Sequence, residues 1–226
     1  MPRCASSFGA SFLRAYLPLF NVLCLGTAFG ATPVIDNERV RVWDVTWSEG
    51  TQSPVSGQLD TLSMYIAGGP VRVADEFGAL QTVTRKTGDA IYVRQGDLRH
   101  EEGAAGSAPA RAIVVELKNH YVPPLVNKTG VQLAFPRPHV KKVLENDRVL
   151  VWDYTWNHGE PTPMHYHDKD VVVVYTENGS LKSTTPDNQV VVNDYTAGLV
   201  RFNTRDRTHT EEVVKGNQHA MMMELK

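Results

Sequence analysis

The chain of 226 residues contains only two cysteines, Cys4 and Cys24, and both fall near its start. The rest of the chain therefore has no disulfide framework, no thiolate metal ligand and no cysteine nucleophile. It also lacks an excess of charge of either sign, with 23 Lys and Arg against 25 Asp and Glu. This balance argues against a nucleic-acid-binding protein, which normally carries a basic patch.

Several catalytic motifs are also absent. The chain has no GxSxG turn, no GxxxxGK[ST] phosphate loop, no GxGxxG after a strand and no HExxH helix motif. These absences argue against an α/β-hydrolase, a P-loop nucleotidase, a dinucleotide-binding enzyme and a helical zinc protease.

The first 30 residues have the pattern of a secretory signal peptide. Two arginines precede an apolar segment without charge at residues 15–26, and the small residues Ala28 and Gly30 follow it. Such a segment is cleaved on export and is too short for a comfortable membrane span. We expect residues 1–30 to be removed, which predicts a periplasmic or secreted protein with no membrane association afterwards; a retained signal anchor is the alternative.

The most informative feature is an internal repeat. Residues 34–50 read VIDNERVRVWDVTWSEG and residues 143–159 read VLENDRVLVWDYTWNHG, with ten of 17 positions identical at an offset of 109. AIVVELK at residues 112–118 and AMMMELK at residues 220–226 match at an offset of 108. The chain therefore consists of two copies of one structural unit.

Each copy is expected to be all-β. Its segments are short, rich in β-branched and aromatic residues, and separated by Gly, Pro, Asp or Asn, and no helical period follows the leader. Short strands with turn signals every 8–12 residues indicate a sandwich or a barrel. We assign residues 31–118 to the first domain and residues 140–226 to the second, with residues 119–139 as a linker because of their proline-rich composition.

The second copy carries a set of candidate metal ligands. His165 and His167 are two residues apart, so on a strand they point to one face. His209 follows 42 residues later on a segment that can return beside them. Three imidazoles with open positions are what a catalytic metal site needs. Glu211 and Glu212 are placed either to orient one of these imidazoles or to be solvated at a strand end.

The spacing of these residues resembles the cupin superfamily, whose motifs are G(x)5HxH(x)3–4E(x)6G and G(x)5PxG(x)2H(x)3N. The positions that match are Gly159, His165, His167, Gly179, Gly198 and His209. The resemblance implies two tandem cupin-type barrels, each a double-stranded β-helix (jelly roll), with the metal site in the second.

One family position departs from the pattern. The metal-binding glutamate of the cupin motif falls on Val171 or Val172, which cannot bind a metal. The nearest carboxylates include Asp170, which strand parity places on the face opposite His167 unless a bulge intervenes. We keep Asp170 as a candidate fourth ligand; otherwise the site has three histidines, which the resemblance allows.

The first copy serves as an internal comparison. At the offset of 109, His165 falls on Ser56, His167 on Gln58 and His209 on His100, so we expect a degenerate first barrel without metal. Residues common to both copies are then expected to serve the fold, and these pairs are Trp43 and Trp152, Asp44 and Asp153, Trp47 and Trp156, and Glu116 and Glu224.

The residues leave three functions open. The first is an exported metal-binding bicupin that acts as a metal-dependent enzyme, of dioxygenase or isomerase type, on a small organic molecule. The second is a non-catalytic protein that binds a small molecule or a metal, and the third is a structural, metal-free pair of barrels. Imidazole ligands suit Fe, Mn, Zn, Ni or Cu. No catalytic residue besides the metal ligands is assigned, and a homodimer stays open.

Overall fold

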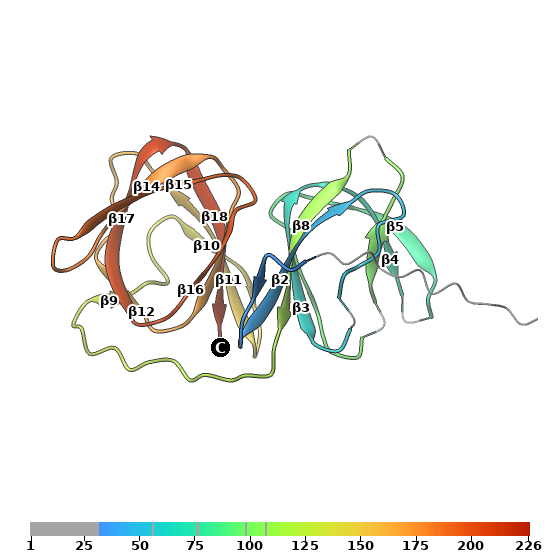
Figure 1. Cartoon of the computed structure of the whole chain (residues 1–226), viewed down its shortest axis with the longest axis horizontal. Helices are drawn as coiled ribbons and strands as arrows, with labels where there is room; N and C mark the ends of the chain where they lie inside the picture. The colour runs from blue at the N-terminus through green and yellow to red at the C-terminus, as the bar shows by residue number, and fades with distance from the viewer. Residues whose placement is uncertain (1–31, 56, 76, 98, 107) are drawn as a thin grey trace, which may run out of the picture.

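Eighteen β-strands build two barrels that lie side by side in this computed structural model (Figure 1). It describes residues 32–55, 57–75, 77–97, 99–106 and 108–226. Within these ranges there is no helix, and hence none long and apolar enough to cross a membrane. The prediction of an all-β chain of two tandem barrels is confirmed. The expected signal peptide lies outside the described residues.

The first barrel consists of a five-stranded sheet in the order β1-β2-β8-β3-β6 and a three-stranded sheet in the order β5-β4-β7. Its strands are β1 (Ile35–Asp36), β2 (Val40–Trp47), β3 (Asp60–Ala67), β4 (Gly69–Ala74), β5 (Leu80–Arg85), β6 (Ala90–Val93), β7 (Glu101–Gly103) and β8 (Ala110–Leu117).

The second barrel consists of two five-stranded sheets, in the orders β10-β11-β18-β13-β16 and β15-β14-β17-β12-β9. Its strands are β9 (Gln132–Leu133), β10 (Val140–Glu145), β11 (Val149–Trp156), β12 (His165–His167), β13 (Val171–Tyr175), β14 (Gly179–Thr184), β15 (Val190–Tyr195), β16 (Val200–Asn203), β17 (Arg207–Gly216) and β18 (Gln218–Leu225).

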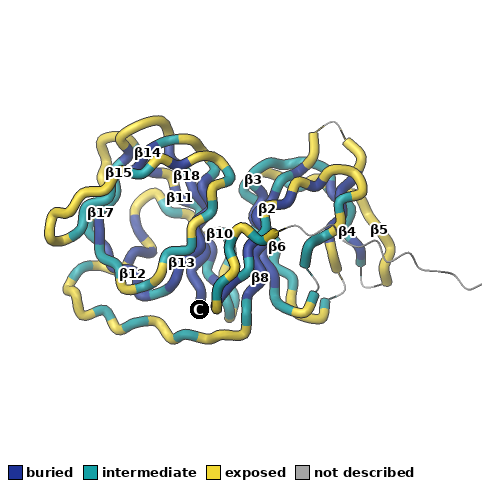
Figure 2. The backbone as a smooth tube through the Cα atoms, viewed as in Figure 1, coloured by how far each residue is buried: buried dark blue, intermediate teal, exposed yellow. Residues whose placement is uncertain are grey.

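The two barrels share a hydrophobic core. One large sheet of each barrel turns its outer face to the other barrel, and Figure 2 shows the dark, buried strands at this junction. The side chains that meet there are Val40, Val42, Leu62, Met64, Ile113, Val115 and Leu117 from the first barrel, and Val149, Val151, Val172, Val174, Met221, Met223 and Leu225 from the second. Both faces of these sheets are thus buried, one against the other barrel and one in the barrel interior.

This double burial explains the sequence of the central strands. An antiparallel strand with one solvated face normally alternates apolar and polar residues. β13 reads VVVVY and all five of its residues are buried, and β18 contains the run AMMMEL. On the outer sheet, by contrast, β15 has five of its six side chains exposed or half-buried. Continuous apolar runs therefore mark the strands at the junction.

The offset in residue number between equivalent positions of the two copies is not constant, and in part of the structure it differs from the value given by the WDxTW boxes. β4, β5 and β6 lie 110 residues before β14, β15 and β16. Gly88 and Gly198, each with φ of 88°, make the same turn and donate a hydrogen bond to the carbonyl of Tyr65 and Tyr175, respectively. The two copies are therefore equivalent at an offset of 110 in this region, one residue more than at their start.

The segment expected to be a linker completes the second barrel. Its part near residues 120–130 runs along the outside, below the barrels in Figure 1. β9 then pairs in parallel with β12, and Ala134 and Phe135 are buried in the interior of the second barrel. The boundary at residue 140 thus lies inside this barrel, because strand pairing and burial begin at Gln132.

Candidate metal centre

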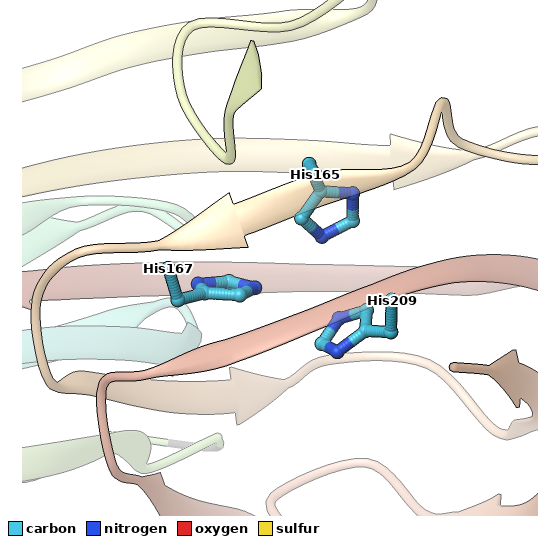
Figure 3. A group of neighbouring side chains, drawn as sticks. All are labelled: His165, His167 and His209. Atoms are coloured by element: carbon cyan, nitrogen blue, oxygen red, sulfur yellow. The ribbon is translucent and has the colours of Figure 1, made fainter. Parts of the chain in front are cut away.

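Three histidines converge inside the second barrel. His165 and His167 lie on β12, and antiparallel pairing with β17 places His209 directly opposite His165. Figure 3 shows the three rings turned toward one another from these two strands. One ligand nitrogen from each lies within 4.8 Å of the others, and all three residues are buried. The period of two along β12 brings both of its imidazoles to one face, as predicted from the sequence.

The hydrogen-bond pattern leaves imidazole nitrogens free for a metal. His165 Nδ1 lies 2.8 Å from the carbonyl oxygen of Pro163, so Nδ1 carries the proton and the lone pair of Nε2 accepts from Arg137 Nη1 at 3.2 Å. His167 Nδ1 and His209 Nε2 are buried and have no hydrogen-bond partner among the described residues. A buried polar atom without a partner costs about 1–3 kcal/mol, and a bound cation relieves this cost. The donor set fits a divalent metal.

The protonation of the histidines also suits metal binding, which requires neutral imidazoles. Burial, followed by the positive charge of Arg137, lowers the pKa of His165 to about 4. Burial likewise lowers the pKa of His209, and that of His167 lies well below its ordinary value for the same reason. At neutral pH none of the three carries a proton that would compete with a metal.

Arg137 reaches the same centre, and sequence analysis missed it. Its side chain is 1% exposed, and its Nη1 lies 3.2 Å from His165 Nε2. The guanidinium is held over the rings of Tyr154 and Phe135, at 4.0 and 5.0 Å from their centroids. Because Arg137 falls in the proline-rich segment expected to be a linker, composition gave no sign of its burial. The short apolar run VQLAF at residues 131–135, just before Arg137, is the sequence signal that could have indicated a buried segment there.

Glu211 supplies a carboxylate to the centre from β17. It accepts a hydrogen bond from Trp156 Nε1 at 3.1 Å, and its oxygens lie 3.5 Å from Arg137 Nη2 and 3.7 Å from His209 Nε2. Burial raises the pKa of Glu211, but His209 and Arg137 outweigh burial and the net pKa is lowered. Glu212, on the other face of the strand, pairs with Lys182. Of the two carboxylates considered, Glu211 is the one beside the histidines.

The structure does not bring Asp170 to this cluster, which corrects the expectation of a fourth ligand there. Asp170 Oδ2 lies 2.6 Å from Arg39 Nη1 of the first barrel, and Oδ1 accepts a hydrogen bond from the backbone of Arg205. The strand of the histidines ends at His167, and Asp170 lies after a bend, just before β13 begins at Val171. Val171 faces the histidines and Val172 faces the other barrel, so Val171 occupies the position of the glutamate in the cupin motif.

The first barrel has none of the three ligands. Glu101 and Glu211 are equivalent, because Glu101 pairs with Val73 as Glu211 pairs with Ser183. His209 lies two residues before Glu211, and Arg99 lies two residues before Glu101. Arg99, and not His100, is therefore the counterpart of His209. This corrects the alignment made at the offset of 109. His100 instead lies 3.2 Å from Glu102. Ser56 lies outside the described residues.

The two barrels also differ in free volume. The cavity beside the histidines of the second barrel is about 20 Å³. It is lined by apolar side chains such as Val171 and Met222 and by the charged side chains of Arg137, Arg207 and Glu211. This volume admits an ion and water-sized ligands. The first barrel contains a cavity of about 480 Å³. The barrel with the histidines is nearly filled, and the one without them is open.

Comparison with solved structures supports the cupin fold. A "Cupin 2 conserved barrel domain protein" from Leptotrichia buccalis aligns over 86% of this chain and 87% of its own, with a TM-score of 0.53 and 11% identity. Oxalate decarboxylase of Bacillus subtilis, in a structure concerned with its Mn(II) centres, aligns over 83% of this chain and 69% of its own, with a TM-score of 0.55 and 11% identity. No protein-family model matches the chain, and no curated protein matches it. The chain thus has the fold of the cupin superfamily in its two-barrel form.

Proposed function

We propose that this protein is an exported bicupin that binds one divalent transition metal in its second barrel through His165, His167 and His209. The observation that carries the proposal is the convergence of three neutral, buried imidazoles, two of which have a nitrogen without a partner among the described residues. Three imidazoles do not select between Fe, Mn, Zn, Ni and Cu. Export rests on the signal-peptide pattern at residues 1–30.

The groups around the histidines favour a compact, negatively charged ligand. When bound, the metal supplies a Lewis acid at positions that the histidines leave open. Arg137 presents a guanidinium beside His165, and an anion at the metal would be its natural partner. The cavity of about 20 Å³ has room for about one water-sized ligand, so even a small carboxylate reaches the metal only if the side chains that line the cavity move apart. We therefore propose a small carboxylate as the substrate class, and the oxalate decarboxylase among the structural neighbours makes oxalate the first compound to assay.

Metal analysis of the purified protein tests the site. We expect about one metal ion per chain, and its loss in both His165→Ala and His167→Ala. His100→Ala is the matched control, because its side chain is half exposed and lies in the barrel without the cluster. That variant should keep its metal. A wild-type protein that carries no metal, and takes up none from Mn, Fe, Ni, Cu or Zn salts, would exclude the proposal.

A second candidate, a metal-free pair of barrels, is favoured by one specific observation. The Arg137 guanidinium already donates toward His165 Nε2 and lies beside Glu211, so a cation is present in the cluster without a metal. In this case the histidines serve the packing of the barrel. Titration with divalent ions separates the two candidates, because a barrel closed by Arg137 should bind them no better than the His165→Ala variant does.

A further inference from the structure

A further cavity lies where the two barrels meet, apart from the histidines and from the interior of the first barrel. Its volume is about 280 Å³, and we call it the junction cavity. Three pairs of equivalent residues from the two copies line it, and these pairs are Arg39 and Arg148, Leu117 and Leu225, and Lys118 and Lys226. The repeat therefore surrounds the cavity from two sides with four side chains that are positively charged at neutral pH.

The carboxylates that pair with these four cations stand outside the cavity. The ion pairs are Arg39 with Asp170, Arg148 with Asp60, Lys118 with Asp36 and Lys226 with Glu145, and none of these carboxylates lines the cavity. Among the described residues, Asp147 is the single carboxylate side chain on the lining, and it lies 3.5 Å from the exposed Arg94. The side chains that line the junction cavity thus carry more positive than negative charge.

The two equivalent arginines differ in their hydrogen bonds. Arg148 donates from Nη1 to a carboxylate at 2.7 Å and from Nη2 to two backbone carbonyl oxygens of the first copy, at 3.4 and 3.1 Å. Arg39 engages Nη1 alone, with Asp170 at 2.6 Å. Its Nε and Nη2 have no hydrogen-bond partner among the described residues, and neither atom is sealed from solvent. Arg39 therefore keeps N–H groups that an acceptor in the cavity can reach.

Positive charge is in excess around Arg39. Its side chain is 9% exposed. Burial lowers the pKa of Arg39, Asp170 raises it, and the guanidinium groups of Arg205 and Arg148 lower it in turn, so that the net pKa is lowered. The side chain of Arg205 donates to the carbonyl oxygen of Pro123 and forms no ion pair with a described residue. An anion beside Arg39 would stabilise its charged form.

We propose that the junction cavity binds a phosphate group, either as inorganic phosphate or at the end of a small phosphorylated molecule. The phosphate oxygens accept hydrogen bonds from Nε and Nη2 of Arg39, since a guanidinium offers two parallel N–H groups that match an oxyanion. Lys118 and Lys226 supply further positive charge from both copies, which favours an anion of two charges over a monocarboxylate. This site is separate from the metal centre, and its ligand contacts both barrels at once.

Calorimetric titration of the metal-free protein at low ionic strength tests the proposal. The probes are inorganic phosphate and glycerol 3-phosphate, with the chloride concentration held constant. We expect one site per chain for at least one probe, and the tighter of the two shows whether the phosphate is free or esterified. Arg137→Gln should bind the probes as wild type does, because Arg137 lies beside His165 inside the second barrel.

Two lysines give a matched pair of variants. Lys226 and Lys142 pair with the same carboxylate, Glu145, at 2.9 and 2.8 Å, but Lys142 does not line the cavity. Lys226→Gln should weaken phosphate binding about tenfold, whereas Lys142→Gln should change it by less than about twofold. Asp147→Asn removes the negative charge from the lining and should tighten binding.

The donors of Arg39 are tested by Arg39→Lys, which keeps a charge beside Asp170 but loses the pair of N–H groups. Phosphate binding should fall by at least about tenfold in this variant. Near-ultraviolet circular dichroism checks that each variant is folded, and the lysine pair decides the question if Arg39→Lys is not. Failure of both probes to bind, equal losses in Lys226→Gln and Lys142→Gln, or loss of binding in Arg137→Gln would each overturn the proposal.

Discussion

Asp170 and Arg39 are 131 residues apart in the chain, and their side chains meet at 2.6 Å across the junction of the two barrels. Both side chains are about nine-tenths buried. The second oxygen of Asp170 accepts a hydrogen bond from the backbone of Arg205, on the way into β17. Asp170 therefore joins the first barrel to the loop that precedes His209, and it serves the assembly of the two barrels rather than the metal centre.

Removing this carboxylate should destabilise the protein without emptying the metal site. Asp170→Ala leaves Arg39 buried without its partner, which costs about 3–5 kcal/mol. We expect a corresponding loss in the free energy of unfolding by urea, with the metal content per folded chain unchanged. Asp187→Ala, in an exposed turn, is the control and should stay within about 0.5 kcal/mol of wild type. If the folded Asp170→Ala variant loses its metal, Asp170 is a metal ligand after all and the prediction is wrong.

The shared core predicts that the barrels unfold together. Met223 is fully buried at the junction, and Met223→Ala should cost about 2–5 kcal/mol. Because the first barrel loses contacts as well, the whole protein should still unfold in one transition at a lower temperature. Differential scanning calorimetry measures this directly. Two separate transitions in the variant or in the wild type would mean that the junction does not couple the barrels.

Arg137 should weaken metal binding in the absence of an anion. Its guanidinium lies beside His165 Nε2, where it repels a second cation. We expect Arg137→Gln to tighten binding of Mn²⁺ or Zn²⁺ by about tenfold, measured by competition with a chromogenic chelator. Arg201→Gln removes a charge that contacts Tyr195 outside the cluster and is the matched control. If the Arg137→Gln variant and the wild type bind the metal ion with equal affinity, the guanidinium does not repel the bound ion and the prediction is wrong.

The histidines predict how the metal-free protein responds to acid. The pKa of His165 is about 4 in the folded chain, against 6.5 for the free side chain. Between these values the unfolded chain binds a proton that the folded chain does not, so stability is complete above pH 6.5 and falls as the pH drops toward 4. His165 alone contributes about 3 kcal/mol to this loss.

Urea unfolding in a chelator at several pH values between 4 and 7 measures this effect. His165→Gln should have a shallower slope of stability against pH than wild type, because it removes one of the three buried imidazoles. A slope that the substitution leaves unchanged would contradict the depressed pKa.

The three histidines were accessible from the sequence because their placement depends on strand parity and on the repeat. An HxH pair presents both rings to one side of any strand, and the spacing of Gly198 and His209 matches the second cupin motif. Arg137 was not accessible. Its burial follows from the parallel pairing of β9 with β12, which joins residues far apart in the chain and leaves no periodic pattern in a two-residue strand.

The register of the first copy shows a second limit. The WDxTW boxes set an offset of 109, which made His100 the counterpart of His209. One added residue in the second copy, between its first strand pair and β13, moves the positions from β13 to the histidine of β17, and a shift of one residue turns each side chain to the other face. Only hydrogen-bond pairing, such as Val73 with Glu101, reveals that Arg99 holds the position.

Alternate residues along the junction strands have separate structural roles. In β3, Leu62 and Met64 face the other barrel, whereas Thr61 and Ser63 face the cavity inside the first barrel. Residues of the first kind fix how the two copies are held together, and those of the second kind determine what each copy can bind. After the duplication, the interior of one copy was thus free to diverge while its face at the junction stayed complementary to the other copy. The same separation gives an engineer a scaffold in which the residues that face a barrel interior can be changed for a new binding specificity, while those that face the junction are kept for cohesion.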